Sequence, residues 1–586
     1  MSIVVLNESD GLKWTRLRSW GVAVIALLLC LTAGTRDAFA LPSNNVPLDN
    51  WSYAALDKLA GFGLIHSDVH GMRPYTRLEV ARLVNEALNS KEEKKLELPP
   101  LIEHFLVRFQ REFKQELTVY GRGREEDPAA LVVKPIEEVK ADYVHSDGQP
   151  RDFIQVNQKG GVRQFKDSNP IGTGIIGTEG TPLLYNNDGI VYGKGNNFSL
   201  QFSSSFQLWD TFSGYVEPIV IERENATPGR FTGPGLSPVG GLDDSDFHLL
   251  KGYAKISPLD SEIEVGRDEM WWGQGARGSL ILTNNAPPMD MLKISNPSPY
   301  LLPWFLEYLG PFKYSVFISQ MNGNLFATSG AAATVANPLF GGERINFKPT
   351  PNFEIGMSRT FEFGGRGVPG GSALDWLKIM TFQNVGGRNT DFSDQRAALD
   401  FRLRMPWLYN IETYLEWGGE DFGRFNFGRG PNNFLFRDDA FIAGIYVPRL
   451  TQDGRTDLRI EYADNVSDQD KSFWYGHGQY ISGYVYNGMI LGNSMGPDAR
   501  DVFARTTHYV REDIRLGLDF DFNYRGRNLG PVVEYNYQGG ADVTWEYSHS
   551  LTFKVRYAFG EIQNFDLVSG DNRTADLFLL EVARRF

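Results

Sequence analysis

The stretch DIRLGLDFDFNYR, residues 513–525, alternates apolar and polar side chains along its whole length. Successive side chains of a β-strand point to opposite faces, so the pattern predicts a strand with one apolar and one polar face. Transmembrane strands run about 9–11 residues, whereas strands of soluble proteins average about 5–6. The length of the stretch therefore favours a membrane-spanning strand over the alternative, a strand of a soluble sandwich. The apolar positions are Ile514, Leu516, Leu518, Phe520, Phe522 and Tyr524.

The same period recurs along the rest of the chain. Residues 399–405, 458–462 and 543–559 alternate in this way, with aromatic residues near the strand ends, where the interfacial girdles of membrane barrels lie. The last strand, ADLFLLEVARRF, ends in phenylalanine and resembles the assembly signal of bacterial outer-membrane barrels. Comparable segments from Leu131 onward predict an all-β transmembrane barrel of about 16–18 antiparallel strands.

The N-terminus carries the pattern of a secretory signal peptide. Basic residues precede an apolar run at 21–33, and Ala38-Phe39-Ala40 is a small-x-small cleavage signature. The run is shorter than the ~20 residues of a transmembrane helix. We expect residues 1–40 to be removed as a signal peptide. Lipoprotein processing at Cys30 is disfavoured because Leu29 is bulky where such sites usually carry a small residue.

Composition narrows the classes of protein further. Cys30 is the only cysteine, so the mature chain has no disulfide. Acidic residues outnumber basic ones, 72 against 58, and the formal net charge is −14, which argues against nucleic acid as a partner. A secreted chain with 13% aromatic residues and no apolar stretch long enough for a spanning helix can cross a membrane only as a closed barrel.

Residues 41–117 lack the strand period and predict a small helical unit in the periplasm. Asn50 or Asp49 can cap a first helix, and Thr76 with Glu79 three residues later forms a capping-box signature for a second. A third helix opens at Pro-Pro, after a charged hinge at 90–95. The first two helices loosely resemble S-layer-homology modules, which bind cell-wall glycans. We favour a bundle packed at the periplasmic mouth of the barrel, which would be formed by residues 118–586.

Long segments rich in Gly, Pro, Asn and Asp alternate with tight connections. Outer-membrane barrels have short periplasmic turns and long extracellular loops, so we expect the long segments at the cell surface. They carry too many aromatic residues for mere disorder and are expected to pack as a cap over the lumen. The expected loops are residues 159–195, 220–247, 271–311, 363–393, 418–438 and 464–511.

One of these loops carries a distinctive motif, GRDEMWWGQGARGSLILTNNAPP, residues 266–288. Its Gly-Arg, Trp-Trp-Gly and Asn-Ala-Pro elements resemble, in order, the signature of Wzi-type capsule-assembly outer-membrane proteins. The stretch 486–501 is similar to the late glycine-rich loop of that family, although Asn493 stands where a histidine is expected. The stretch VPLDNWSYAALDKLAGFGLI, residues 46–65, is similar to the entry helix of the family. The resemblance implies a large barrel with a periplasmic helical element and loops that bind exported capsular polysaccharide.

The motif residues also suit carbohydrate chemistry. Sugars present an apolar face and a rim of hydroxyls, so a sugar site combines an aromatic platform with planar hydrogen-bonding groups. An arginine can pair with the carboxylate of an acidic sugar. The candidate polysaccharide-binding residues are Trp271, Trp272, Arg267, Gln274, Arg277, Asn284 and Asn285.

A structural interpretation of the same residues stays open. Neighbouring side chains on a strand point in opposite directions, so one tryptophan of the pair can face lipid while the other packs inside. Arg267 can equally pair with Glu264 or Asp268 in a polar lumen. The sequence alone does not decide which tryptophan faces sugar.

Enzymatic and metal chemistry find little support. His66 and His70 flank a turn, and no serine–histidine–acid set falls on one strand face, so we expect neither catalysis, a cofactor nor a metal site. We therefore predict a non-enzymatic outer-membrane lectin of a Gram-negative cell that binds capsular or extracellular polysaccharide and supports capsule assembly or attachment. Its other expected partners are outer-membrane lipid, lipopolysaccharide and the barrel assembly machinery. The alternatives are a carbohydrate-selective porin with a cell-wall-binding N-terminal module, or an outer-membrane phospholipase or glycan-modifying enzyme.

Overall fold

The computed structural model describes most of the chain after the expected signal peptide, which lies outside the described residues together with Cys30. The described residues are 42–121, 131–155, 175–208, 212–225, 242–258, 261–326, 334–368, 373–380, 393–422, 436–437, 439–466, 474–528 and 531–586.

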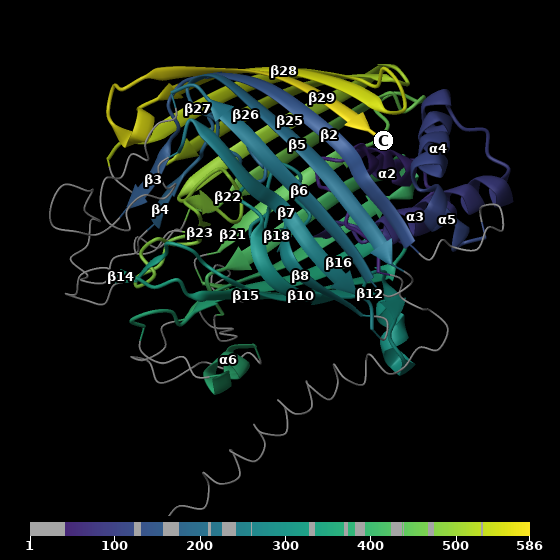
Figure 1. Cartoon of the computed structure of the whole chain (residues 1–586), viewed down its shortest axis with the longest axis horizontal. Helices are drawn as coiled ribbons and strands as arrows, with labels where there is room; N and C mark the ends of the chain where they lie inside the picture. The colour runs from purple at the N-terminus through teal and green to yellow at the C-terminus, as the bar shows by residue number, and fades with distance from the viewer. Residues whose placement is uncertain are drawn as a thin grey trace, which may run out of the picture.

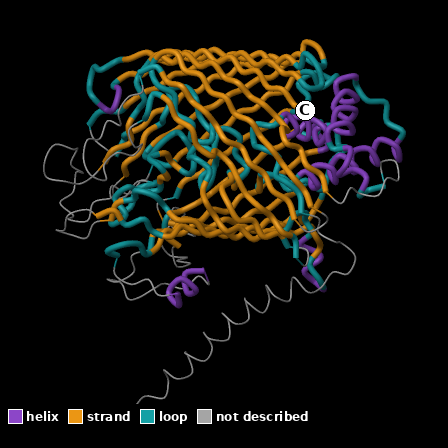
Figure 2. The backbone as a smooth tube through the Cα atoms, in the orientation of Figure 1, coloured by secondary structure: helices purple, strands orange, loops and turns teal. Residues whose placement is uncertain are grey.

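Within them, 18 antiparallel wall strands close into a barrel, which confirms the predicted architecture (Figures 1 and 2). Each wall strand pairs with the next along the chain, and the last pairs with the first from Glu138↔Arg585 to Asp147↔Asp576. The wall strands are β2 (Leu131–Asp147), β5 (Gly195–Leu208), β6 (Phe212–Arg223), β7 (Ser245–Ile256), β8 (Glu262–Asp268), β10 (Met289–Ser295), β12 (Pro311–Gln320), β15 (Leu339–Thr350), β16 (Phe353–Phe363), β17 (Asp394–Met405), β18 (Ile411–Gly419), β21 (Ala440–Val447), β22 (Thr456–Asp464), β25 (Ala499–Arg511), β26 (Ile514–Arg525), β27 (Glu534–Trp545), β28 (Leu551–Gln563) and β29 (Arg573–Arg585).

The alternation in residues 513–525 places apolar side chains on the outer face of β26 and polar ones in the lumen. Leu518 and Phe520 are 58% and 50% exposed, whereas Asp521 and Asn523 are 3% and 2% exposed. The barrel therefore has a greasy outside and a hydrophilic inside, which is the arrangement that a membrane barrel requires.

The two ends of the barrel differ. At one end the connections are short, such as residues 351–352 between β15 and β16 and residues 512–513 between β25 and β26. We call this the short-turn end. The opposite end, which we call the long-loop end, carries longer segments such as 465–498.

Two of the expected loops are wrong in extent, because each contains a wall strand. Residues 271–311 include β10 and residues 464–511 include β25. Both strands alternate weakly: the outer parity of β10 starts with Asp290, and that of β25 holds Arg500, Thr506 and His508. Several of the other expected loops lie partly outside the described residues.

The N-terminal unit packs against the short-turn end, beside the C-terminus (Figure 1). Asn50 caps its first helix by accepting a hydrogen bond from the Ser52 amide at 3.0 Å, and Thr76 caps the second by accepting from the Glu79 amide at 3.0 Å. The expected hinge at 90–95 is instead the end of the second helix, because its Lys and Glu residues are good helix formers. The helices are α2 (Trp51–Gly61), α3 (Arg77–Lys94), α4 (Pro100–Glu112) and α5 (Lys114–Thr118).

The remaining helices and strands are short and do not belong to the set of wall strands. Among the described residues, no helix combines the length and apolar character that crossing a membrane requires. The small elements are β1 (Met72–Arg73), β3 (Asp152–Gln155), β4 (Ile175–Thr178), β9 (Trp271–Trp272), β11 (Tyr300–Leu301), η1 (Trp304–Leu309), β13 (Leu325–Phe326), β14 (Thr334–Val335), α6 (Ala373–Met380), η2 (Pro406–Leu408), β19 (Asp421–Phe422), β20 (Phe436–Arg437), β23 (Val485–Tyr486), β24 (Met489–Ile490) and η4 (Phe565–Leu567).

Candidate functional site

Residues 269–288 leave the wall after β8, cross the lumen and return to the wall at β10. We call this segment the plug. Its strand β9 pairs with β1 of the N-terminal unit, with Trp272 opposite Met72 and Trp271 opposite Arg73. The Gly273 amide adds a hydrogen bond to the Gly71 carbonyl at 2.9 Å. The motif therefore joins the barrel to the N-terminal unit inside the lumen.

Both tryptophans of the motif lie inside the lumen. Trp272 is 1% exposed and meets the Phe317 ring edge-on, with 5.3 Å between ring centroids. Trp271 is 5% exposed and lies under the guanidinium of Arg73, 4.9 Å from the ring centroid. Neither ring faces lipid, because the rule that alternate residues face outward holds for wall strands and β9 is a ribbon within the lumen.

Carboxylates of the wall hold the plug in place. Glu416 of β18 accepts hydrogen bonds from the Gly275 amide at 2.7 Å, the Leu280 amide at 2.9 Å and the Ser279 hydroxyl at 3.0 Å. The side chain is 1% exposed, so these bonds form away from water. Buried backbone donors need such partners, since an orphaned donor costs about 1–3 kcal/mol.

Carboxylates on other wall strands likewise accept backbone amides of the plug or of the N-terminal unit. Glu354 of β16 accepts from the amides of His70 and Gly71, and Glu461 of β22 accepts from the amides of Ala276 and Arg277. Together with Asp400 of β17 and Asp521 of β26, which bind Gln274 and Arg277, they form what we call the carboxylate latch: Glu354, Asp400, Glu416, Glu461 and Asp521.

Two glycines of the motif are required by this close fit. A Cβ atom on Gly275 would stand 1.9 Å from the Gly278 carbonyl oxygen, and one on Gly278 would stand 2.6 Å from the Asn493 side chain. Both positions exclude any larger residue unless the plug rearranges. The glycines of the motif thus serve compact folding of the plug.

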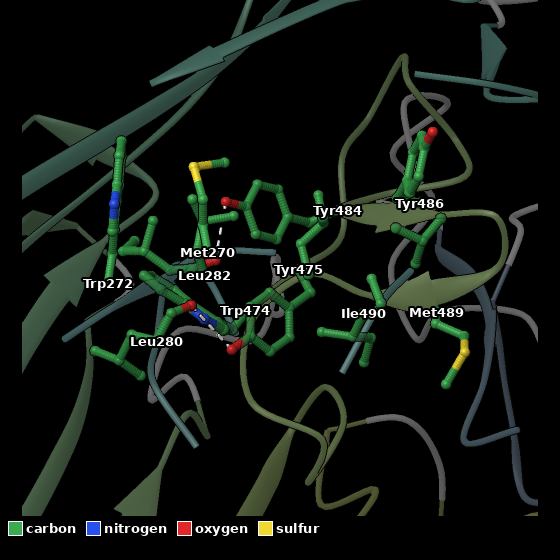
Figure 3. Packing of buried hydrophobic residues seen from close by; sticks show 14 of the residues in the cluster. Met270, Trp272, Leu280, Leu282, Trp474, Tyr475, Tyr484, Tyr486, Met489 and Ile490 are labelled. Atoms are coloured by element: carbon green, nitrogen blue, oxygen red, sulfur yellow. Dashed lines mark hydrogen bonds between the residues drawn. The ribbon is translucent and has the colours of Figure 1, made fainter. Parts of the chain in front are cut away.

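A second segment, residues 474–498, covers the plug from the long-loop end, and we call it the cap. The Tyr475 and Tyr484 hydroxyls donate to the carbonyls of Leu280 and Ile281, both at 3.0 Å. The Thr283 amide donates to the Leu491 carbonyl at 2.8 Å. Figure 3 shows the aromatic rings of the cap packed against the apolar side chains of the plug. The expectation that long segments pack over the lumen agrees with this arrangement.

The polar motif residues of the plug are also engaged. Gln274 is buried and donates to Glu354 at 3.0 Å and Asp400 at 2.8 Å. The Arg277 guanidinium donates to Asp521 at 2.6 Å and lies over the Tyr185 ring. The side-chain amide of Asn284 donates to the Asp188 carboxylate at 3.1 Å, and the side-chain amide of Asn285 donates to the Ile490 carbonyl at 2.9 Å. Six of the seven candidate residues therefore meet in the plug.

Arg267 is the exception, because it lies on the outer parity of β8. It pairs with Asp290 of β10 through two hydrogen bonds, at 2.8 and 2.7 Å, rather than with Glu264 or Asp268. Those two carboxylates lie on the lumen face of the same strand and bind Lys293 and Asn45 respectively. The alternation along β8 predicts that Arg267 lies on the opposite face from Glu264 and Asp268. Its partner Asp290 was not predicted, because that residue lies in a segment that we expected to be a loop.

Comparisons with known proteins agree with the motif and the fold. The family model described as capsule assembly protein Wzi matches residues 167–577, a range that includes the plug and the cap. The chain belongs to the Wzi family. This confirms the resemblance inferred from the motif.

One curated protein and two solved structures are similar to this chain. An uncharacterised 55.8 kDa protein from the cps region of Klebsiella pneumoniae is 26% identical over 278 residues, 47% of this chain and 47% of that protein, so the match spans about half of each. The solved structure of Escherichia coli Wzi, described as a carbohydrate-binding β-barrel of the outer membrane involved in group 1 capsule assembly, is 18% identical. It covers 93% of this chain and 99% of that chain with a TM-score of 0.61, which shows a shared fold. Pseudomonas aeruginosa OprD, 8% identical, covers 78% of this chain and 95% of that chain with a TM-score of 0.41.

In this Wzi-family chain, buried charges also connect the plug with the N-terminal segment. Glu269 accepts a hydrogen bond from the Leu48 amide at 2.9 Å. Lys251 of β7 lies 3.2 Å from Glu269 and 2.9 Å from Asp188. Burial raises the pKa of Glu269 well above its ordinary value, and the nearby Asp188 carboxylate raises that pKa further. The protonation of Glu269 is therefore linked to the docking of the N-terminal segment.

A cavity of about 740 Å³ remains at the short-turn end, between the N-terminal unit and the wall. Some of its charged side chains pair with one another: Lys140 lies 2.9 Å from Asp49, and Arg585 lies 2.6 Å from Glu138. Among the described residues, no group of three or more His, Cys, Asp or Glu side chains is arranged to hold a metal ion.

The residues that the sequence did not single out are mainly the carboxylates of the latch. They are separated from the plug by 80 to 244 positions in the chain, so no local pattern connects them with it. The sequence offers one indication of these carboxylates, which is that each occupies a lumen-facing position of a wall strand.

Proposed function

We propose that the chain is an outer-membrane barrel that binds capsular or other extracellular polysaccharide at its long-loop end. In this role it supports capsule assembly or attachment and performs no catalysis. The observation that carries the proposal is membership of the Wzi family over residues 167–577, which include the plug and the cap. The family's description as a capsule assembly protein, and that of its E. coli member as carbohydrate-binding, support the same role.

The proposal includes an orientation in the membrane. Bacterial outer-membrane barrels have short turns on the periplasmic side and long loops outside. We therefore place the short-turn end and the N-terminal unit, residues 41–117, in the periplasm and the long-loop end at the cell surface. The exposed apolar wall then contacts membrane lipid and lipopolysaccharide, and the C-terminal strand is read by the barrel assembly machinery.

The N-terminal unit is proposed to be a fixed part of the barrel rather than a free cell-wall-binding module. Asp68 of this unit lies 2.7 Å from Lys348 and 3.0 Å from Arg404. Lys58 lies 2.7 Å from Asp457 and donates to two turn carbonyls of the wall. Buried pairs of this kind are strongly destabilised when one partner is removed, so the unit is expected to stay docked.

Six of the seven candidate residues enter the proposal through the plug. Because Trp271 and Trp272 are buried, a sugar can stack on either ring only if the plug opens. We propose that these six residues hold the cap in the shape that presents the polysaccharide site. Arg267, on the outer wall, holds β8 against β10.

A plugged lumen favours binding over conduction. The latch contacts the plug from five wall strands, and Trp272 packs against Phe317 of a sixth. A sugar-selective porin needs a continuous aqueous path, which the plug and the cap obstruct. Single-channel recording separates the two functions, since large stable conductance would favour the porin.

The proposed function is tested in cells that lack the gene. We expect intact cells to lose polysaccharide from the surface to the medium, while the total amount made stays unchanged. Wild-type protein restores retention, and so does the control Leu415→Ala, which alters only an outward apolar side chain of β18. Unchanged cell-bound polysaccharide in the deletion strain would contradict the proposal.

A further inference from the structure

One connection is longer than the others at the short-turn end. Residues 296–310, between β10 and β12, contain β11 and the short helix η1, with the sequence YLLPWFLEYL at 300–309. Trp304, Phe305 and Tyr308 are 84%, 71% and 78% exposed. Three large aromatic side chains that project together from one turn call for a partner, because exposed apolar clusters usually mark an interaction surface.

The support beneath these rings lies on the outer face of the barrel. Leu302 is buried, and Leu306 packs with it against Phe312 and Tyr314 of β12 and Ile345 and Phe347 of β15. Those four wall residues share the outward parity, and they pair across the two strands as Phe312↔Phe347 and Tyr314↔Ile345. The lumen parity of the same strands instead holds polar residues such as Lys313 and Arg344. The segment is therefore folded back against the outside of the wall, beside the end of β12 in Figure 1.

The segment is also held rigidly. Tyr300 and Leu301 pair with Phe312 and Pro311. Gly310 has φ +74°, and a Cβ atom there would stand 1.9 Å from the Lys348 carbonyl oxygen. Trp304 itself has φ +63°, a left-handed conformation that is costly for a bulky residue. A rigid support and a strained backbone indicate that the presentation of the aromatic rings is a specific feature.

We propose that residues 300–309 form an interfacial anchor, with Trp304, Phe305 and Tyr308 inserted at the boundary between headgroups and acyl chains of the phospholipid leaflet at the short-turn end. The inference rests on the proposed membrane location of the barrel. The anchor continues the outward apolar surface of β10, where Ile294 and Leu292 are 40% and 43% exposed. Aromatic side chains are enriched at this depth, and apolar residues dominate the lipid face of interfacial helices.

The charge of the segment points to lipid of ordinary composition. Glu307 is the only ionisable side chain besides the tyrosines in residues 300–309, and no lysine or arginine is present. Attraction to anionic headgroups needs cations. Insertion is therefore expected in zwitterionic vesicles and should not depend on salt.

Site-specific labelling is straightforward because Cys30, the only cysteine of the sequence, lies in the expected signal peptide and is absent from the mature chain. Single-cysteine variants of the full mature chain carry an environment-sensitive dye at Phe305→Cys in the anchor, Leu518→Cys on the mid-wall and Asp453→Cys in the turn between β21 and β22. Leu518 is 58% exposed on the outer wall, and the Asp453 side chain is 51% exposed. Each is placed in phosphatidylcholine vesicles with nitroxide groups on the headgroup or deep in the acyl chain, and iodide is the aqueous quencher.

The anchor predicts that the dye at position 305 is quenched most by headgroup nitroxide and weakly by iodide, at low and high salt alike. The dye at 518 should respond to the deep nitroxide and the dye at 453 to iodide. Iodide quenching at 305 as strong as at 453 would overturn the anchor. Protection from both iodide and lipid nitroxide would also overturn it and would identify a protein contact. If 518 were not quenched by lipid, the membrane location itself would fail, which distinguishes the two proposals.

Discussion

Replacing Glu416 with alanine should open the plug while the barrel stays intact. The change removes the acceptor for the Gly275 and Leu280 amides, at 2.7 and 2.9 Å, whereas the Ser279 hydroxyl keeps the Trp272 carbonyl as an acceptor. Each orphaned buried donor costs about 1–3 kcal/mol, and the two costs are not fully additive. We therefore expect roughly 2–6 kcal/mol in favour of local opening, or an increase of about thirtyfold to ten-thousandfold in the open population.

Hydrogen exchange measured by mass spectrometry reports this opening directly. Peptides that cover residues 273–285 should lose protection by that factor, while peptides from β26 and β27 keep theirs. Leu415→Ala is the matched control, because its side chain is adjacent on β18 but is 40% exposed on the outer wall. Unchanged exchange in residues 273–285 would refute the latch. Equal loss of protection throughout the wall would refute the separation of plug and barrel.

Three further outcomes follow from the same contacts. Trp272→Ala should lower the free energy of unfolding in urea by roughly 3–5 kcal/mol, because the ring is buried and leaves a cavity; a change below about 1 kcal/mol would contradict this packing. Gly275→Ala should expose the plug to added protease, whereas Gly539→Ala, where a Cβ atom has nothing within 4 Å, should not; equal resistance would contradict the close fit. Because burial raises the pKa of Glu269, its contribution to docking is full below its ordinary pKa and is lost as the pH rises through the raised value. Exchange at Leu48, corrected for its intrinsic pH dependence, should therefore increase with pH in the wild type but not in Glu269→Gln.

The barrel could be predicted because its information is local. In residues 513–525 every second side chain lies on the same face of the strand, and the recurrence of such long alternating strands favours a closed membrane barrel. Strands whose alternation is weak were missed, because a local pattern is the only information that the prediction used. The wall strand β10 combines Asp290 on one parity with Lys293 on the other, and its seven residues are few for a spanning strand.

The site could be predicted only in part, because its decisive contacts are long-range. The motif identified the right segment, and the family match agrees with it. The environment of Trp272 could not follow from strand parity, since the residue lies in a ribbon inside the lumen. Glu416 is 141 positions from Gly275, and neither residue signals the other in the sequence.

The carboxylate latch gives the acidic balance of the chain a structural use. Latch residues such as Glu416 and Glu461 accept hydrogen bonds from backbone amides of the plug, so these carboxylates hold a glycine-rich segment without needing a cation on it. Other latch carboxylates are paired with arginines, as Asp400 is with Arg344 and Asp521 with Arg277.

Direct binding of purified polysaccharide tests the central claim. The mature protein is placed in lipid nanodiscs, immobilised, and exposed to capsular polysaccharide purified from the cell that makes the protein, with empty nanodiscs as the reference. We predict saturable binding to the protein nanodiscs alone, retained in Leu415→Ala and weakened when Glu416→Ala loosens the plug beneath the cap. Binding no greater than that of empty nanodiscs would contradict the account.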